Sequence, residues 1–139
     1  MKRKSNSNMY LNKHSVFLLQ YHIVLVTKYR KKILDGEIRD YVYEVIKETL
    51  LNKDCNVLEI NGEEDHVHIL VECPPDVAPS EIVQVTKIRS ARFTRKKFEE
   101  KIKEIYSTNK FWADGYFIST VSEKTLENVT NYIRNQSHW

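Results

Sequence analysis

The sequence predicts an α+β fold, a ferredoxin-like (split βαβ, RRM-like) antiparallel sheet with an added C-terminal helix. Strand-like and helix-like apolar patterns alternate along the chain in the order β-α-β-β-α-β-α. The length of 139 residues suits one compact domain. No apolar run approaches the ~20 residues that a membrane helix needs. We therefore expect a single domain over residues 1–139, with residues 1–14 as a flexible basic arm rather than a secretory signal.

The first strand and the first helix come from the N-terminal half. Residues 16–27 are rich in β-branched and aromatic side chains, which is typical of a long strand. Asp35-Gly36 then interrupts the pattern. Apolar residues recur at three- and four-residue spacing over residues 37–51, and this spacing predicts an amphipathic helix.

A hairpin is expected next. Residues 55–60 predict its first strand, Asn61-Gly62 a turn, and residues 66–73 its second strand. Because side chains alternate between the faces of a strand, the aliphatic residues of the second strand share one face, and His66 and His68 share the other. The crossover helices of a split-βαβ sheet cover one face, where the aliphatic residues belong. We therefore expect both histidines on the open face.

A second helix, a fourth strand and a last helix complete the pattern. Pro79 and the serine after it mark a helix that is expected to run to Phe98 and to resume toward Ile105. Residues 116–121 predict the fourth strand, and Ser122 is the expected N-cap of the last helix. The two cysteines lack metal-site spacing, so we expect buried thiols in a reducing cytoplasm rather than a disulfide.

Basic side chains gather in residues 28–32 and 87–97, and the second stretch holds six basic residues and no acidic one. The net charge of +3 alone is weak evidence, but segregated positive charge beside aromatic residues suits a phosphate backbone. A solvated surface is an equally good interpretation of either stretch. The candidate contacts to a phosphate backbone, which would be DNA contacts if the partner is DNA, are Lys28, Arg30, Lys87, Arg89, Arg92 and Lys96.

The candidate chemistry lies on the third strand and the last helix. His66 and His68 project in parallel with Cα atoms roughly 6.5–7 Å apart, so both rings can reach one metal ion, although such pairs also arise by chance. Tyr132 and Gln136 are one helical turn apart and share a face. A glutamine carbonyl beside two imidazoles suits Mg²⁺ or Mn²⁺, and a neighbouring tyrosine gains a way to act as nucleophile. The alternative is a tyrosine packed on the sheet and a solvated surface amide.

Two strings carry a family resemblance. The string Asp65-His66-Val67-His68-Ile69-Leu70-Val71 resembles the HUH motif (His, hydrophobic, His) of single-strand nicking enzymes. Together with Tyr132-Ile133-Arg134-Asn135-Gln136, it makes the chain similar to the single-tyrosine transposases of the insertion-sequence 200/605 group. The similarity spans nearly the whole chain. Further matching residues are 21–30, 79–83, 87, 90–92 and 111–117. In the last of these segments, Asp114 stands in place of an expected proline.

The resemblance implies that His66, His68 and Gln136 ligate a divalent metal, Mg²⁺ or Mn²⁺, and that Tyr132 is the nucleophile. It implies cleavage and rejoining of single-stranded DNA with subterminal hairpins through a 5′-phosphotyrosine intermediate, in a prokaryotic cytoplasm. It also implies a homodimer, because excision and joining with one tyrosine per site need two sites. Whether the tyrosine acts in its own or in a partner's site stays open. We expect no nucleotide cofactor and no membrane association, and we expect Asp65 to orient a histidine.

Other functions also fit parts of this pattern. Many RNA-recognition modules use an RRM-like sheet with an open face, but they place aromatic residues on the central strands, where this chain has histidines. A replication-initiation nickase or a domesticated, palindrome-associated transposase would share the HUH motif, but such proteins tend to be longer. An inactive relic is disfavoured because the histidine pair, the tyrosine and the glutamine are all intact.

Overall fold

The computed structural model describes residues 19–121 and 131–135. The expected basic arm and the Ser122 N-cap lie outside the described residues. Residues 131–135 form a helical turn. Within the described part, the helices are too short or too polar to cross a membrane. The other elements are β1 (Leu19–Val26), η2 (Lys28–Arg30), α1 (Gly36–Asn52), β2 (Asn56–Glu63), β3 (His66–Cys73), α2 (Pro79–Lys97), α3 (Glu99–Ile105) and β4 (Phe117–Thr120).

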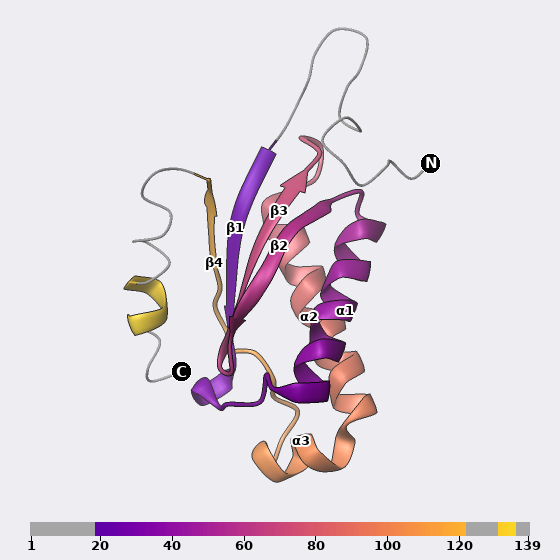
Figure 1. Cartoon of the computed structure of the whole chain (residues 1–139), viewed down its shortest axis with the longest axis vertical. Helices are drawn as coiled ribbons and strands as arrows, with labels where there is room; N and C mark the ends of the chain where they lie inside the picture. Colours follow the sequence, from indigo (N-terminus) through magenta and orange to yellow (C-terminus); the bar gives the residue numbers. More distant parts are fainter. Residues whose placement is uncertain (1–18, 122–130, 136–139) are drawn as a thin grey trace, which may run out of the picture.

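The four strands form one antiparallel sheet in the order β2-β3-β1-β4. Helices α1 and α2 cover one face, and the helical turn of residues 131–135 lies on the other side, next to β4 (Figure 1). The two central strands pair along their whole length, from Leu19 opposite Cys73 to Val26 opposite His66. The expected α+β class and the order of elements through the fourth strand are confirmed.

The main core lies between the sheet and the two long helices. Val67, Ile69 and Val71 of β3 are fully buried there, which confirms the expected alternation of faces. Both cysteines are free and buried, as expected. Helix α1 contributes the aliphatic stripe that its spacing predicts, which includes Ile38, Val42, Ile46 and Leu50. Helix α2 contributes Ile82 and Val83.

The opposite face of the sheet carries a second, smaller apolar cluster. Val24, Val26 and Ala113 are buried in it, and Phe117 packs against them. Tyr132 and Ile133 of the C-terminal turn also pack there. This part of the face expected to be open is therefore covered by the end of the chain.

The prediction of a turn at Asn61-Gly62 is wrong. Both residues lie inside β2, and the turn is at Glu64-Asp65. A Cβ at Gly62 would overlap the carbonyl oxygen of His66 and lie 2.9 Å from the Cα of Val67. Glycine is therefore required here because the two backbones approach closely, and not because a turn needs a positive φ.

Candidate active site

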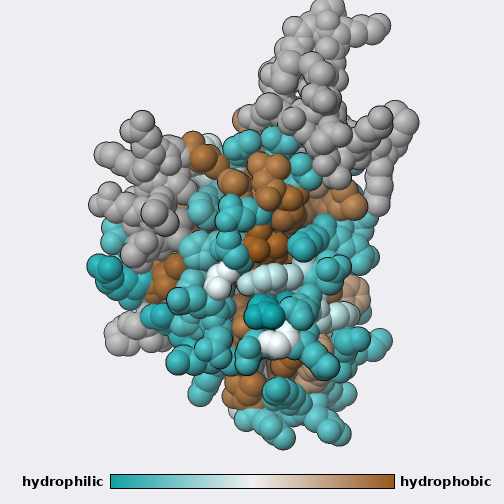
Figure 2. Space-filling view, in the orientation of Figure 1, coloured by the Kyte–Doolittle hydropathy of each residue, from teal (hydrophilic) through white to brown (hydrophobic). Residues whose placement is uncertain are grey.

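A hollow of about 580 Å³ lies over the hairpin end of β2 and β3, on the side away from the long helices. Side chains from the hairpin, η2 and the C-terminal turn line it, so segments distant in sequence meet there. In the space-filling view, the surface around the lower ends of the strands is mainly hydrophilic (Figure 2). The lining residues are Arg30, Asn61, Gly62, Glu63, His66, His68, Ile133 and Arg134.

The two expected histidines meet in this hollow. The ring centroids of His66 and His68 are 4.9 Å apart and the rings are tilted by 56°. Burial, followed by the charges of His66 and His22, lowers the pKa of His68 to about 4. A neutral imidazole at neutral pH keeps the lone pair that a metal ion requires.

Asp65 fixes the orientation of the His66 ring. Nδ1 of His66 donates a hydrogen bond of 2.8 Å to one carboxylate oxygen of Asp65, and the other oxygen accepts from Nε and Nη2 of Arg30 at 2.9 Å each. Burial opposes ionisation of Asp65, but the hydrogen bonds from His66 and Arg30 outweigh it and lower its pKa. This arrangement leaves Nε2 of His66 as the nitrogen available to a ligand.

A third histidine that the sequence reading missed lies beside the pair. The ring centroid of His22 on β1 is 5.6 Å from that of His68. Burial lowers the pKa of His22, although Glu59 opposes the shift. The register places Val24 opposite His68, so His22 is its diagonal neighbour. Alternation along β1 places His22 and Val24 on the same face of that strand. The sequence alone does not show how β1 pairs with β3, so it could not place His22 beside His68.

The C-terminal turn reaches the hollow, but the Tyr132 ring does not line it. The ring lies against Phe117, with centroids 5.4 Å apart, within the small apolar cluster. Burial raises the pKa of the Tyr132 phenol. The next two residues, Ile133 and Arg134, do line the hollow. Gln136 lies outside the described residues.

The donors of the hollow suit a divalent cation. Among the described residues, Glu63, Asp65 and His66 offer ligand atoms that lie within 4.8 Å of one another. With His68, the site combines imidazole nitrogens and carboxylate oxygens, and the Asp65 hydrogen bond fixes one imidazole. Nitrogen and oxygen donors of this kind fit Mn²⁺ or Mg²⁺.

Some of the side chains expected to contact DNA are bound within the protein, and others are exposed. The ammonium of Lys87 donates to the carbonyls of Ala113, Asp114 and Gly115 at 2.8, 3.0 and 3.1 Å. Arg89 is turned toward α1, where its Nε donates to Thr49 at 3.1 Å. Both cations are therefore engaged within the protein.

The other expected contacts differ in how accessible they are. Lys28 lies 3.4 Å from the carboxylate of Asp114, and Arg30 is held by Asp65. Arg92 and Lys96 are exposed on α2, and no ion pair involves them within the described ranges. Tyr29 is exposed, so its ring is accessible to an unpaired base. Trp112 is buried and its ring nitrogen donates to Ser90 at 2.9 Å, so its ring is not accessible in this way.

Comparisons with known proteins agree on one family. The sequence profile described as "Transposase IS200 like" matches residues 15–136. The transposase for insertion sequence element IS200 of Salmonella typhimurium is 31% identical over 123 residues, which cover 88% of this chain and 80% of the relative. The ISDra2 transposase TnpA of Deinococcus radiodurans is 30% identical over 121 residues, or 87% and 86% of the two chains.

Two solved structures share this fold. A candidate transposase of Deinococcus radiodurans R1 superposes with a TM-score of 0.85 at 26% identity, over 93% of this chain and 98% of the other. A REP-associated tyrosine transposase bound to a REP hairpin shares the fold, with a TM-score of 0.55 at 8% identity over 91% and 76% of the two chains. This chain belongs to the IS200-like transposase family.

Proposed function

We propose that this protein is a DNA transposase that cleaves and rejoins single-stranded DNA at the ends of an insertion element. The observation that carries the proposal is the hollow in which His66 and His68 meet carboxylate and guanidinium groups, next to the turn that bears Tyr132. Family membership supplies the reaction class. On this proposal the fold is a ferredoxin-like sheet to which a C-terminal helix with the nucleophile has been added.

His66, His68 and Gln136 are the proposed ligands of Mg²⁺ or Mn²⁺. The bound cation would supply positive charge to a non-bridging phosphate oxygen and to the departing 3′-oxygen. Asp65 holds the His66 ring in the tautomer that leaves Nε2 for the ligand role. Arg134 adds a positive side chain at the edge of the same hollow, where it suits a phosphodiester.

Tyr132 is the proposed nucleophile. Its phenol oxygen forms a bond to phosphorus as the bond to the 3′-oxygen breaks, so that the products are a 5′-phosphotyrosine and a free 3′-hydroxyl. The phenol proton passes to solvent water, and the departing 3′-oxygen takes up a proton from solvent water. Because burial raises the pKa of Tyr132, the packed position disfavours the phenolate. The proposal therefore requires the C-terminal turn to shift, or to complete the hollow of a second copy.

A homodimer supplies the two sites that excision and joining need. Each copy contributes one tyrosine, so two covalent intermediates can exist at once. The REP-associated transposase was solved with a REP hairpin, and we extend this to propose hairpin-bearing single-stranded DNA as the partner of this chain.

Tyr132→Phe tests the nucleophile. We expect the variant to lose the SDS-stable protein–DNA adduct and strand cleavage on DNA taken from the element ends, in the presence of Mg²⁺ or Mn²⁺. Tyr41→Phe, on α1 in the opposite layer, is the matched control and should cleave normally. Undiminished cleavage by Tyr132→Phe would refute the nucleophile assignment. Binding without any cleavage by the unaltered protein would instead favour a binding module.

A further inference from the structure

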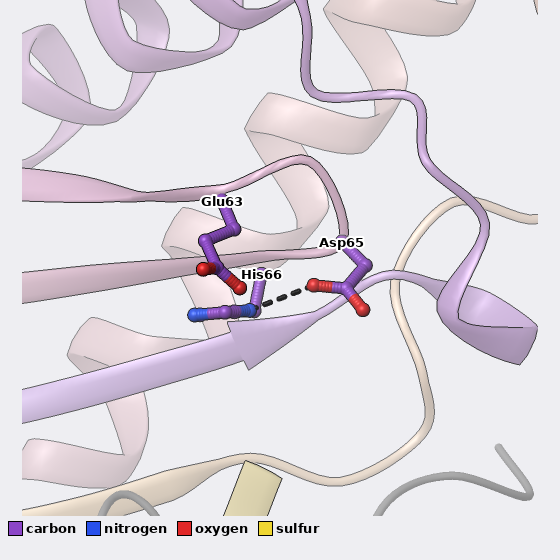
Figure 3. Close-up of side chains that lie close together, drawn as sticks. All are labelled: Glu63, Asp65 and His66. Atoms are coloured by element: carbon purple, nitrogen blue, oxygen red, sulfur yellow. Dashed lines mark hydrogen bonds and ion pairs between the residues drawn. The ribbon is translucent and has the colours of Figure 1, made fainter.

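We infer that Glu63 is an additional, anionic ligand of the metal ion for which His66 and His68 are proposed. This inference rests on the proposed function. Glu63 is the last residue of β2 and is paired with His66, the first residue of β3. Its carboxylate and a ring nitrogen of His66 are within 4.8 Å of each other. Figure 3 shows the Glu63 carboxylate beside the His66 ring, with Asp65 at the Nδ1 end of that ring.

The two acids beside His66 are not equivalent. Both oxygens of Asp65 are engaged, one by Nδ1 of His66 and the other by the guanidinium of Arg30. A metal ion would have to displace one of these interactions to bind Asp65. Glu63 is exposed, and within the described ranges no hydrogen bond or ion pair engages its carboxylate. Asp65 is therefore the residue that orients His66, and Glu63 is the carboxylate available to a cation.

The backbone holds Glu63 close to the histidines. Gly62 allows β2 to approach the backbone of His66 and Val67 more closely than any residue with a Cβ could. The next side chain along β2 is Glu63, which lines the same hollow as His66 and His68. The carboxylate therefore comes from a strand neighbouring β3, and its position depends on the pairing of the two strands.

The charge balance of the site favours an anionic ligand. Histidine binds a metal ion as an uncharged imidazole, so histidine ligands do not offset the charge of a divalent cation. Arg134 adds a further positive side chain to the hollow, whereas the charge of Arg30 is balanced by Asp65. Glu63 supplies a negative, hard oxygen donor of the kind that Mg²⁺ and Mn²⁺ prefer. The Glu63 carboxylate should therefore raise the affinity of the site for these cations even when no DNA is bound.

Mn²⁺ binding to the full chain without DNA tests this inference independently of cleavage. Free Mn²⁺ is measured by electron paramagnetic resonance for the unaltered protein, Glu63→Gln, Glu64→Gln and His68→Ala, with circular dichroism to confirm folding. Glu63→Gln should weaken binding by about tenfold or more. Glu64→Gln makes the same charge change one residue away, outside the lining of the hollow, and should stay within about twofold because salt screens exposed charge.

Two results would overturn the role of Glu63. Unchanged affinity in Glu63→Gln, with weakened binding in His68→Ala, would remove Glu63 as a ligand and leave the proposed histidine site intact. Equal weakening in Glu63→Gln and Glu64→Gln would show a general electrostatic effect rather than ligation. Unchanged affinity in His68→Ala would instead refute the proposed metal site itself, and the inference with it.

Discussion

Nδ1 of His66 donates a 2.8 Å hydrogen bond to the carboxylate of Asp65, the residue directly before it in the chain. Adjacent residues on a strand point to opposite faces, but Asp65 lies in the turn just before β3, so its side chain can reach the ring. The bond fixes the tautomer and the rotation of the imidazole. Arg30, from the segment after β1, holds the other carboxylate oxygen and so limits the movement of Asp65.

Asp65→Ala should weaken Mn²⁺ binding by about 10- to 100-fold, because the ring of His66 loses the partner that orients it. Isothermal titration with Mn²⁺ measures the effect. Asp35→Ala is the control, since Asp35 is exposed before α1 and its side chain makes no capping hydrogen bond. Affinity equal to that of the unaltered protein would show that Asp65 does not position the ligand.

Gly62→Ala should lower the free energy of unfolding by about 1–3 kcal/mol, because the added methyl group meets the backbone of β3 and forces the strands apart. Urea denaturation followed by circular dichroism measures the loss. Asn61→Ala, at the preceding and exposed position of β2, should change stability far less. Equal stability of Gly62→Ala and the unaltered protein would contradict the close approach of the two strands.

Alternation along β3 was enough to predict the local part of the site. It placed Val67, Ile69 and Val71 in the core and the histidine pair on the opposite face. The contributions of His22 and Glu63 depend on the pairing of β1 and β2 with β3, and the sequence did not reveal that register. The Asn-Gly signal at residues 61–62 failed for a related reason, because the close approach of a neighbouring strand overrode a local turn preference.

The basic residues on α2 also show that the sequence does not reveal contacts between distant segments. Arg89, Arg92 and Lys96 are three and four residues apart, which places them on one side of a helix, and Lys87 belongs to the same basic stretch. In the structure, Arg89 donates to Thr49 of α1, and Lys87 donates to the backbone carbonyl of Ala113. Both partners are distant in sequence, so helical spacing alone could not reveal them. Helical spacing therefore identified exposed cations at Arg92 and Lys96, but it could not identify which cations the fold itself uses.

Lys87→Met should lower the free energy of unfolding by about 1.5–3 kcal/mol, because the carbonyls of Ala113, Asp114 and Gly115 lose a charged donor. Methionine keeps much of the aliphatic length, so the change removes mainly the ammonium. Chemical denaturation measures the loss, and Lys101→Met, at an exposed position of α3, is the control. Stability equal to that of the control would show that the three hydrogen bonds contribute little.

Arg134→Ala should weaken binding of single-stranded DNA and reduce the slope of log K against log salt concentration by about 1, as expected for the loss of one phosphate contact. Arg134 is exposed on the C-terminal turn and lines the hollow with His66 and His68, whereas Arg30 in the same hollow is neutralised by Asp65. Fluorescence anisotropy with labelled DNA at several salt concentrations measures both quantities. Lys47→Ala, exposed on α1 in the opposite layer, removes the same charge and should leave the slope nearly unchanged.

Because Arg134 cannot ligate a cation, its removal should not weaken Mn²⁺ binding, which separates this phosphate contact from the metal ligands. An unchanged slope in Arg134→Ala would place the bound phosphates outside the hollow.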